Sequence, residues 1–110
     1  MDRFYVIFET SARTERGGID REATEAIVDA TLDQLLERQD LIDPDAGAEM
    51  SSGRVEFMMT VEASTPEQAV ADVGDHLRRC VGVALERSAG MVVEFTGATA
   101  VEQSTIPAAS

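Results

Sequence analysis

The side chains that most often carry catalysis are scarce in this sequence. It has one histidine, His76, and one cysteine, Cys80, and no pattern of serine, histidine and aspartate typical of a nucleophilic triad. His76 falls at the margin of the apolar stripe of a predicted helix, which is typical of a partly buried structural histidine. Cys80 falls well inside that stripe, so we expect a buried, unreactive thiol. Neither residue has the partners of a zinc site, and we expect no metal site and no catalytic residue.

Anion binding has a single weak signal. Gly17 and Gly18 precede a predicted helix, and Arg13 and Arg16 lie close to them in the sequence. A helix N-terminus attracts anions, but the composition of a flexible loop explains these residues as well. The sequence contains no P-loop and no dinucleotide fingerprint, and we expect no cofactor.

The charge of the chain limits its partners. Twenty-one acidic residues stand against nine basic ones, and the net charge is −12. Nucleic-acid affinity comes mainly from basic side chains, and anionic membranes attract the same groups, so we expect neither as a partner. No apolar run approaches the roughly 18 residues that span a bilayer. The charged N-terminus lacks the order of a signal peptide, and we expect a cytoplasmic protein.

Acidic residues follow one face of the first predicted helix, opposite its apolar stripe. They are Glu22, Glu25, Asp29, Asp33, Glu37 and Asp40. Like charges four residues apart repel by roughly 0.2–0.5 kcal/mol per pair in isolated helices. Solvation of an exposed surface explains the pattern. The alternative is a docking face for a basic protein, with mimicry of DNA as its extreme form.

The chain is organised around a strand predicted at residues 53–63. Its apolar side holds Val55, Phe57, Met59 and Val61. Its other side holds Glu56, Met58, Thr60 and Glu62. Strict alternation of this kind is typical of a strand with one buried side. Met58 is unusual on a side that only meets water.

The first half of the chain predicts a strand, a loop and a helix. Residues 3–10 alternate as a strand, and the polar residues 11–18 predict a mobile loop. A helix capped by Asp20 runs from residue 21 to about residue 39, and a turn over 41–47 follows it. The predicted apolar face of this helix comprises Ile27, Val28, Thr31, Leu32, Leu35 and Leu36.

A weaker strand at 46–51 is predicted to join the central strand through a two-residue hairpin turn. This register keeps the apolar positions on one face and sets Met50 opposite Val55. It also sets Glu49 opposite Glu56, a like-charge pair that destabilises slightly.

A second helix has the clearest start signal in the sequence. Thr65, Pro66 and Gln68 predict a capping box with proline at the first helical position. The helix is expected to end near residue 89, with Gly90 as its C-cap. Its predicted apolar face comprises Val70, Val73, Leu77, Cys80, Val81 and Ala84.

A last strand at 91–101, in which Gly97 favours a bulge, completes the order β-α-β-β-α-β. This order resembles the ferredoxin-like split βαβ motif. Right-handed, non-crossing connections place the strands in the order 4-1-3-2 with both helices on one face. We therefore expect an α+β two-layer sandwich with an antiparallel four-stranded sheet, as a single domain over residues 1–103, and a frayed tail at 104–110. The fold hosts many activities and predicts none.

The face of the sheet that no helix covers is the main candidate site. Its predicted centre comprises Tyr5, Ile7, Met58 and Thr60, and its predicted edge comprises Glu94 and Thr96. An apolar centre with a polar rim is typical of an interface, although scattered surface apolar residues need no explanation. Because both helices cover the opposite face, we favour an interface, and two-fold symmetry makes a homodimer the simplest one. An RNA platform needs more aromatic residues and a less negative field.

Three functions stay open. The preferred one is a non-enzymatic interaction or small-ligand-binding module, homodimeric through the uncovered face. The second is an acidic protein that binds a basic protein, or mimics DNA, through the first helix. The third is a small enzyme with a pocket at the sheet interface that uses Tyr5, Arg54 or His76.

Overall fold

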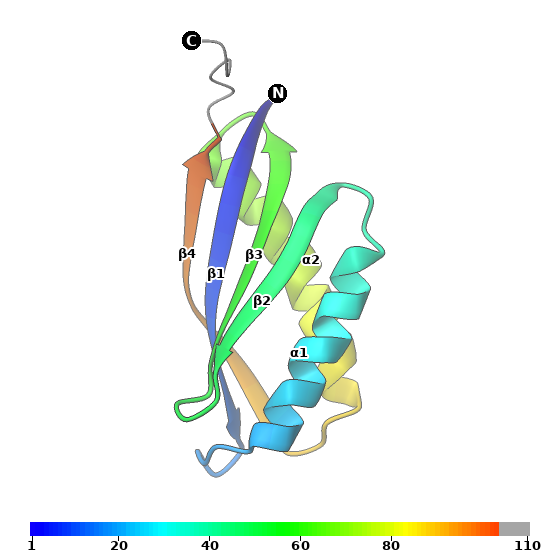
Figure 1. Ribbon diagram of the computed structural model, residues 1–110, viewed down its shortest axis with the longest axis vertical. Coiled ribbons are helices and arrows are strands. Elements are labelled where there is room, and N and C mark those ends of the chain that lie inside the picture. The colour runs from blue at the N-terminus through cyan, green and yellow to red at the C-terminus, as the bar shows by residue number, and fades with distance from the viewer. Residues whose placement is uncertain (104–110) are drawn as a thin grey trace.

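The computed structural model describes residues 1–103, and its elements follow the predicted order (Figure 1). They are β1 (Asp2–Thr14), α1 (Arg21–Leu36), β2 (Leu41–Glu49), β3 (Arg54–Ala63), α2 (Pro66–Glu86) and β4 (Met91–Glu102). The strands form one antiparallel sheet in the order β2-β3-β1-β4, which is the predicted order read from the other edge. Both helices cover one side of this sheet, so the predicted ferredoxin-like two-layer fold is confirmed. The predicted frayed tail, 104–110, lies outside the described residues.

The core forms where β1 and β3 face the helices. The two strands pair without a break from Asp2 opposite Ala63 to Ser11 opposite Arg54. Directly opposite residues project to the same face, so alternate pairs are buried. The large buried side chains of this pair are Phe4, Val6, Phe8, Val55, Phe57, Met59 and Val61. Each such burial stabilises the fold by about 1.5–3 kcal/mol before entropy is counted.

Side-chain caps fix the start of both helices. The carboxylate of Asp20 accepts a hydrogen bond from the amide of Ala23 at 3.0 Å. The hydroxyl of Thr65 accepts one from the amide of Gln68 at 3.1 Å. The predicted capping box is only half formed, because the side chain of Gln68 donates to Asp72 at 2.7 Å instead of reaching back. The predicted cap residues are therefore confirmed, and the prediction that Gln68 bonds back to Thr65 is wrong.

Both helices end about three residues earlier than the sequence predicts. α1 ends at Leu36, whose side chain is 60% exposed and does not belong to the buried face as predicted. The residues of α1 that are buried are Thr24, Ile27, Thr31 and Leu35. α2 ends at Glu86 with Arg87 as its C-cap. Gly90, predicted as the C-cap, instead takes a φ of +83° in the turn into β4.

β1 continues to Thr14, where the sequence predicts a mobile loop from residue 11. Ala12 is buried, and its amide donates to the carbonyl oxygen of Gly53 at 2.8 Å. Only glycine fits position 53, because its φ is +73° and a Cβ there would lie 2.4 Å from the Ala12 oxygen. Pairing with β4 as far as Met91 continues the sheet here despite the polar composition.

The turn between β2 and β3 is longer than predicted. Ala48, and not Met50, lies opposite Val55, so the turn spans 50–53. The observed register differs by two residues from the predicted one, which keeps the same side chains on the core face. It also sets Glu49 opposite Arg54, and this opposite-charge pair replaces the like-charge pair that the predicted register required.

β2 begins at Leu41, in a stretch for which the sequence predicts only a turn. Leu41 is buried against the core. The register then shifts between Ile42 and Asp45, where Asp43 has a φ of +50° and Pro44 has no amide to donate. The turn residues therefore form a bulge within the strand. The buried side chain of Leu41 holds the strand in place before the bulge.

β4 carries a bulge next to Gly97, as predicted. Phe95 lies opposite Thr10 and Gly97 lies opposite Glu9, so Thr96 is the extra residue. The hydroxyl of Thr96 donates to the carbonyl oxygen of Glu9 at 3.1 Å. Because the bulge inserts one extra residue, each residue after it lies on the opposite face from the one that regular alternation predicts.

We predict that Phe57→Ala lowers the free energy of unfolding by about 3–5 kcal/mol, because Phe57 is fully buried between the sheet and the helices. Glu62→Ala is expected to change it by less than about 0.5 kcal/mol, because the ion pair of Glu62 with Arg3 is half exposed. Urea unfolding of both variants gives the comparison. The opposite ranking would mean that the assignment of the two sheet faces is wrong.

Candidate functional site

Neither α1 nor α2 covers the second face of the sheet, and we call it the open face (Figure 1). Its rows follow from the pairing of directly opposite residues. One central row consists of Val101, Tyr5, Thr60 and Ile42, from β4 to β2. The next row consists of Thr99, Ile7, Met58 and Asp45. The four residues predicted for this face, Tyr5, Ile7, Met58 and Thr60, are therefore neighbours on it.

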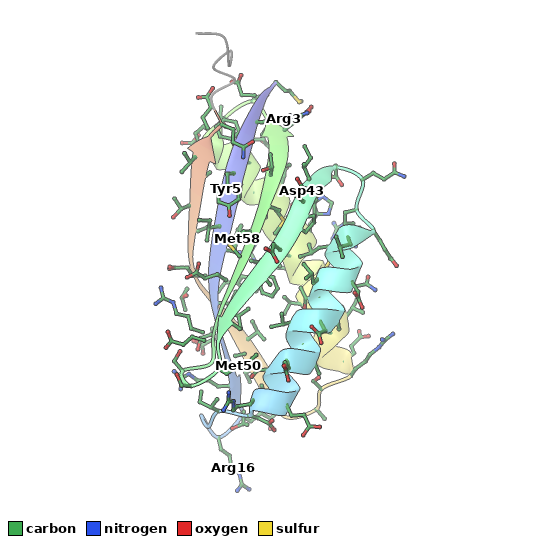
Figure 2. All side chains as sticks on the ribbon, viewed as in Figure 1. Arg3, Tyr5, Arg16, Asp43, Met50 and Met58 are labelled. Carbon is green, nitrogen blue, oxygen red and sulfur yellow. The ribbon has the colours of Figure 1, made fainter. Side chains whose placement is uncertain are left out.

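Apolar side chains gather at the centre of the open face. Tyr5, Ile7, Ile42 and Met58 are partly buried, and Val101 is 56% exposed. Tyr5 and Met58 project from neighbouring strands on the side turned away from the helices (Figure 2). Cross-strand packing accounts for their partial burial, since no other element of the described part of the chain covers them. Their role as an interface stays a prediction.

Two members of this cluster, Ile42 and Val101, were not predicted. Ile42 lies just before the bulge of β2, in a stretch with turn composition. Val101 lies after the bulge of β4. Alternation counted from Glu94 without a bulge would place Val101 on the helix-covered face, whereas it lies on the open face opposite Tyr5. The predicted rim residue Thr96 is the bulge residue itself. The glycine at position 97 was the only signal of this displacement.

Thr60 is buried although it lies on the open face. Its side chain is 8% exposed, and its hydroxyl accepts a hydrogen bond from the side-chain amide of Gln103 at 3.3 Å. The backbone amide of Gln103 donates to the carbonyl oxygen of Arg3, which continues the β4 ladder beyond Glu102. Gln103 thus closes one end of the apolar cluster with a polar group.

Charged pairs border the cluster at both ends. Arg3 lies 3.5 Å from Glu62 at one end. At the other, Glu9 and Glu56 lie directly opposite each other, and Arg54 relieves their repulsion at 3.0 Å from Glu9 and 3.9 Å from Glu56. These side chains are about half exposed, so each pair contributes at most about 1 kcal/mol. The open face therefore has an apolar centre and a rim of mixed charge.

The predicted acidic face of α1 is exposed along its whole length. Its members are Glu22, Glu25, Asp29, Asp33, Glu37 and Asp40. A groove of about 430 Å³ runs beside part of it, between α1 and α2. Asp29, Asp33 and Glu37 line one wall of this groove, and Val83 and Arg87 line the other. The docking role of this surface stays a prediction.

Asp40 differs from the other acidic residues because it has an internal partner. Its Oδ2 lies 2.7 Å from Nε2 of His76, which is largely buried on α2. The sequence predicts no partner for His76, because the pair joins residues that are 36 apart in the chain. Nδ1 of His76 is buried without a hydrogen-bond partner among the described residues. The pair therefore ties the turn between α1 and β2 to α2, and it occupies Nε2 of the His76 ring.

The residues of the enzyme hypothesis do not converge. Tyr5 and Arg54 lie on the open face, three rows apart along the central strands. His76 lies in the helical layer on the other side of the sheet. Tyr5 and His76 therefore lie on opposite sides of the sheet, and an enzyme site that uses Tyr5, Arg54 or His76 stays a prediction.

The predicted anion site is also not supported. Arg13 donates to the hydroxyl of Ser11 at 3.2 Å and to the carbonyl oxygen of Gly17 at 3.4 Å. The first turn of α1 is already capped by the carboxylate of Asp20. The N-terminal dipole of α1 therefore meets a negative group of the chain itself. A small pocket of about 170 Å³ beside Arg13 also contains Glu15 and Glu94, which disfavours anions further.

Cys80 lies in the core on α2, and its predicted burial is confirmed. Burial raises the pKa of the Cys80 thiol above its ordinary value of 9.0, and the neighbouring Arg38 only partly offsets this effect. A protonated and inaccessible thiol is a poor nucleophile and a poor metal ligand.

Two further observations concern ions and membranes. Within residues 1–103, no group of three His, Cys, Asp or Glu side chains is placed to hold a metal ion. In the same part of the chain, neither helix is long and apolar enough to span a bilayer.

Comparison of the sequence with models of known protein families gives no match, and comparison with curated proteins gives no significant relative.

We predict that Cys80 makes the fold less stable in alkali. Because the thiol has a higher pKa in the folded chain, its stabilising contribution is complete below about pH 9 and is lost as the pH rises through the raised value. The free energy of unfolding should fall more steeply between about pH 8 and pH 11 in the wild type than in Cys80→Ala. Equal slopes would mean that Cys80 is not desolvated in the folded state.

Proposed function

We propose that the protein is a non-enzymatic interaction module that forms a homodimer through its open face. The observation that carries this proposal is the row of Val101, Tyr5, Thr60 and Ile42, together with Ile7 and Met58 in the next row. These side chains form an apolar centre with a charged rim, on the sheet face that neither α1 nor α2 covers. Such an arrangement is typical of the buried centre of an interface.

The size of the open face fits a stable dimer. Strands lie about 4.8 Å apart and rise about 3.3 Å per residue, so four strands of about ten residues cover roughly 600 Å² in projection. A standard interface buries about 800 Å² of accessible surface per partner. Because side chains make the accessible surface larger than its projection, two open faces in contact would reach this size.

The distribution of charge favours a second copy as the occupant. Two chains with a net charge of −12 repel each other. Contact through the open faces keeps the acidic surfaces of the two α1 helices on opposite outer sides. The rims also carry both signs, with Arg3 beside Glu62 and Arg54 beside Glu9. A two-fold arrangement can therefore set basic groups against acidic ones around the apolar centre.

A small apolar ligand held between two open faces is the ligand-binding form of the same proposal. The apolar centre would supply the contact surface, and Tyr5 and Thr60 would supply the nearest polar groups. A cytoplasmic location also stays a proposal from the sequence.

The test of the proposal replaces an apolar residue at the centre of the open face. Met58→Asp places a charge where the dimer would exclude water, which costs several kcal/mol for an unpaired group. We expect sedimentation at micromolar concentration to show half the mass of the wild-type assembly, with an unchanged circular dichroism spectrum. Leu36→Asp is the matched control, because Leu36 is exposed on α1 and its replacement should leave the mass unchanged.

Val101→Asp gives an independent version of this test. Val101 is more than half exposed in the single chain, so its replacement should not unfold the protein. A wild type that is monomeric at high concentration would contradict the homodimer. A Met58→Asp variant that keeps the wild-type mass would contradict the role of the open face.

A second candidate function rests on the groove between α1 and α2. Its lining includes the small residues Ala26, Ala30 and Ala84, and its acidic wall contains Asp29 and Asp33. Small lining residues allow a partner backbone to approach, and the acidic wall favours a basic segment. We propose docking of a basic amphipathic helix as the alternative function.

The double variant Asp29→Asn, Asp33→Asn tests this alternative with an arginine-rich helical peptide as the probe. Stability should stay unchanged or rise by a few tenths of a kcal/mol, because repulsion along α1 is relieved. Affinity for the peptide should fall at least about tenfold at low salt, and the wild-type affinity should itself fall as salt is added. The control is Asp75→Asn, Glu86→Gln, which removes the same charge outside the groove. Equal losses in both double variants would indicate only a nonspecific charge effect.

A further inference from the structure

The two edges of the sheet differ in how well they can pair with another strand. The β2 edge is interrupted by Asp43, with its φ of +50°, and by Pro44, which lacks an amide. Irregularities of this kind protect an edge from pairing. β4, from Met91 to Glu102, is longer than β2 and contains no proline. It forms the opposite edge of the sheet (Figure 1).

Several backbone groups of β4 point away from the sheet. The amide of Gln103 donates to the carbonyl oxygen of the directly opposite Arg3, so this is a hydrogen-bonded pair of the ladder. Hydrogen-bonded and non-bonded pairs alternate along an antiparallel ladder. Residues 97, 99 and 101 therefore bond to β1, and Ala98, Ala100 and Glu102 direct their amide and carbonyl groups to the free edge. The bulge at Thr96 leaves this segment regular.

A groove of about 420 Å³ runs beside this edge, between β4 and α2. Phe8, Phe95 and Val70 give it an apolar lining. Ala71 on α2 and Gly97 and Ala98 on β4 are the small residues along it. Because small side chains allow close approach, another strand can lie against β4 with alternate side chains directed into the groove.

Two charged residues of α2 lie on this groove, and they have opposite signs. The guanidinium of Arg78 lies 5.2 Å from the centre of the Phe95 ring. Glu67 lies eleven residues earlier on the helix, about 16 Å away along its axis. Neither has an ion-pair partner among residues 1–103. A two-fold axis near Ala98, perpendicular to the sheet, brings Arg78 of each copy toward Glu67 of the other.

We propose that β4 pairs in antiparallel orientation with β4 of a second copy, which joins two sheets into one of eight strands. The pairing satisfies the outward backbone groups, and two Arg78–Glu67 contacts between copies fix its register. This interface is separate from the open face. Both together give a tetramer in which two eight-stranded sheets pack through their open faces.

Ala98→Pro tests the edge. Ala98 is exposed, and its amide points away from β1, so proline removes no hydrogen bond of the single chain. We expect the sedimenting mass to fall from four chains to two, with circular dichroism unchanged. Ala98→Ser keeps the amide and should retain four chains. If Ala98→Pro unfolds the chain, the charge variants below decide the question.

Reversal of the two charges tests the register without changing the backbone. Arg78→Glu alone, or Glu67→Arg alone, sets like charges against each other across the axis and should also halve the mass. The double variant Glu67→Arg, Arg78→Glu restores opposite charges and should return to four chains. A double variant that stays at half mass would overturn the proposed pairing.

The combined masses separate this proposal from the open-face homodimer. Four chains in the wild type and two in either Ala98→Pro or Met58→Asp support both interfaces. Two chains in the wild type and in Ala98→Pro, but one in Met58→Asp, overturn the edge proposal alone. Two chains in the wild type and in Met58→Asp, but one in Ala98→Pro, support the edge and contradict the open-face proposal. A monomeric wild type overturns both proposals.

Discussion

The unbroken pairing of β1 with β3 is the constraint on which the rest of the structure depends. Ten consecutive residue pairs set Phe4, Val6 and Phe8 in the same layer as Val55, Phe57 and Met59. Both helices pack on that layer and bury it almost completely. The same alternation leaves Tyr5, Ile7 and Met58 on the opposite face, where no element within residues 1–103 covers them. A two-layer fold with two helices can bury only one face of its sheet. The pairing of β1 with β3 therefore determines both the core and the candidate interface.

Two irregularities then decide what surrounds this central pair. The bulge of β4 at Thr96 moves Val101 onto the open face beside Tyr5, and it turns Ala98 and Ala100 toward the helical side. The bulge of β2 at Asp43 and Pro44 leaves Ile42 on the open face and disrupts that edge of the sheet. Each bulge thus adds one apolar residue to the cluster, on the β4 side and on the β2 side. Only the bulge of β2 also prevents its edge from pairing with another strand. The acidic residues of α1 lie on the outer side of the other layer and stay clear of both proposed contacts.

The sequence predicts the fold well because its signals are local and agree with one another. Alternation in β1 and β3 and the caps at Asp20 and Thr65 fix the elements, and the open-face positions of Tyr5, Ile7, Met58 and Thr60 follow from parity. The errors occur where tertiary contacts outweigh composition, as at Leu41 and Ala12, whose burial makes strands of stretches with turn or loop character. The Asp40–His76 contact depends on how two distant elements meet, and no periodicity encodes that. The occupant of the open face is likewise not encoded, since an uncovered face specifies chemistry and size but not identity.

The most direct test of the central claim uses the only fluorescent residue of its kind in the chain. Tyr5 is the single tyrosine, the sequence has no tryptophan, and Tyr5 lies at the centre of the open face. Acrylamide quenching of tyrosine fluorescence, measured over a dilution series from about 100 μM to about 0.1 μM, reports whether a second copy covers this face. The open-face dimer predicts weak quenching at high concentration and a sharp rise as the protein is diluted. Strong quenching at every concentration would contradict the claim that the open face is buried by self-association.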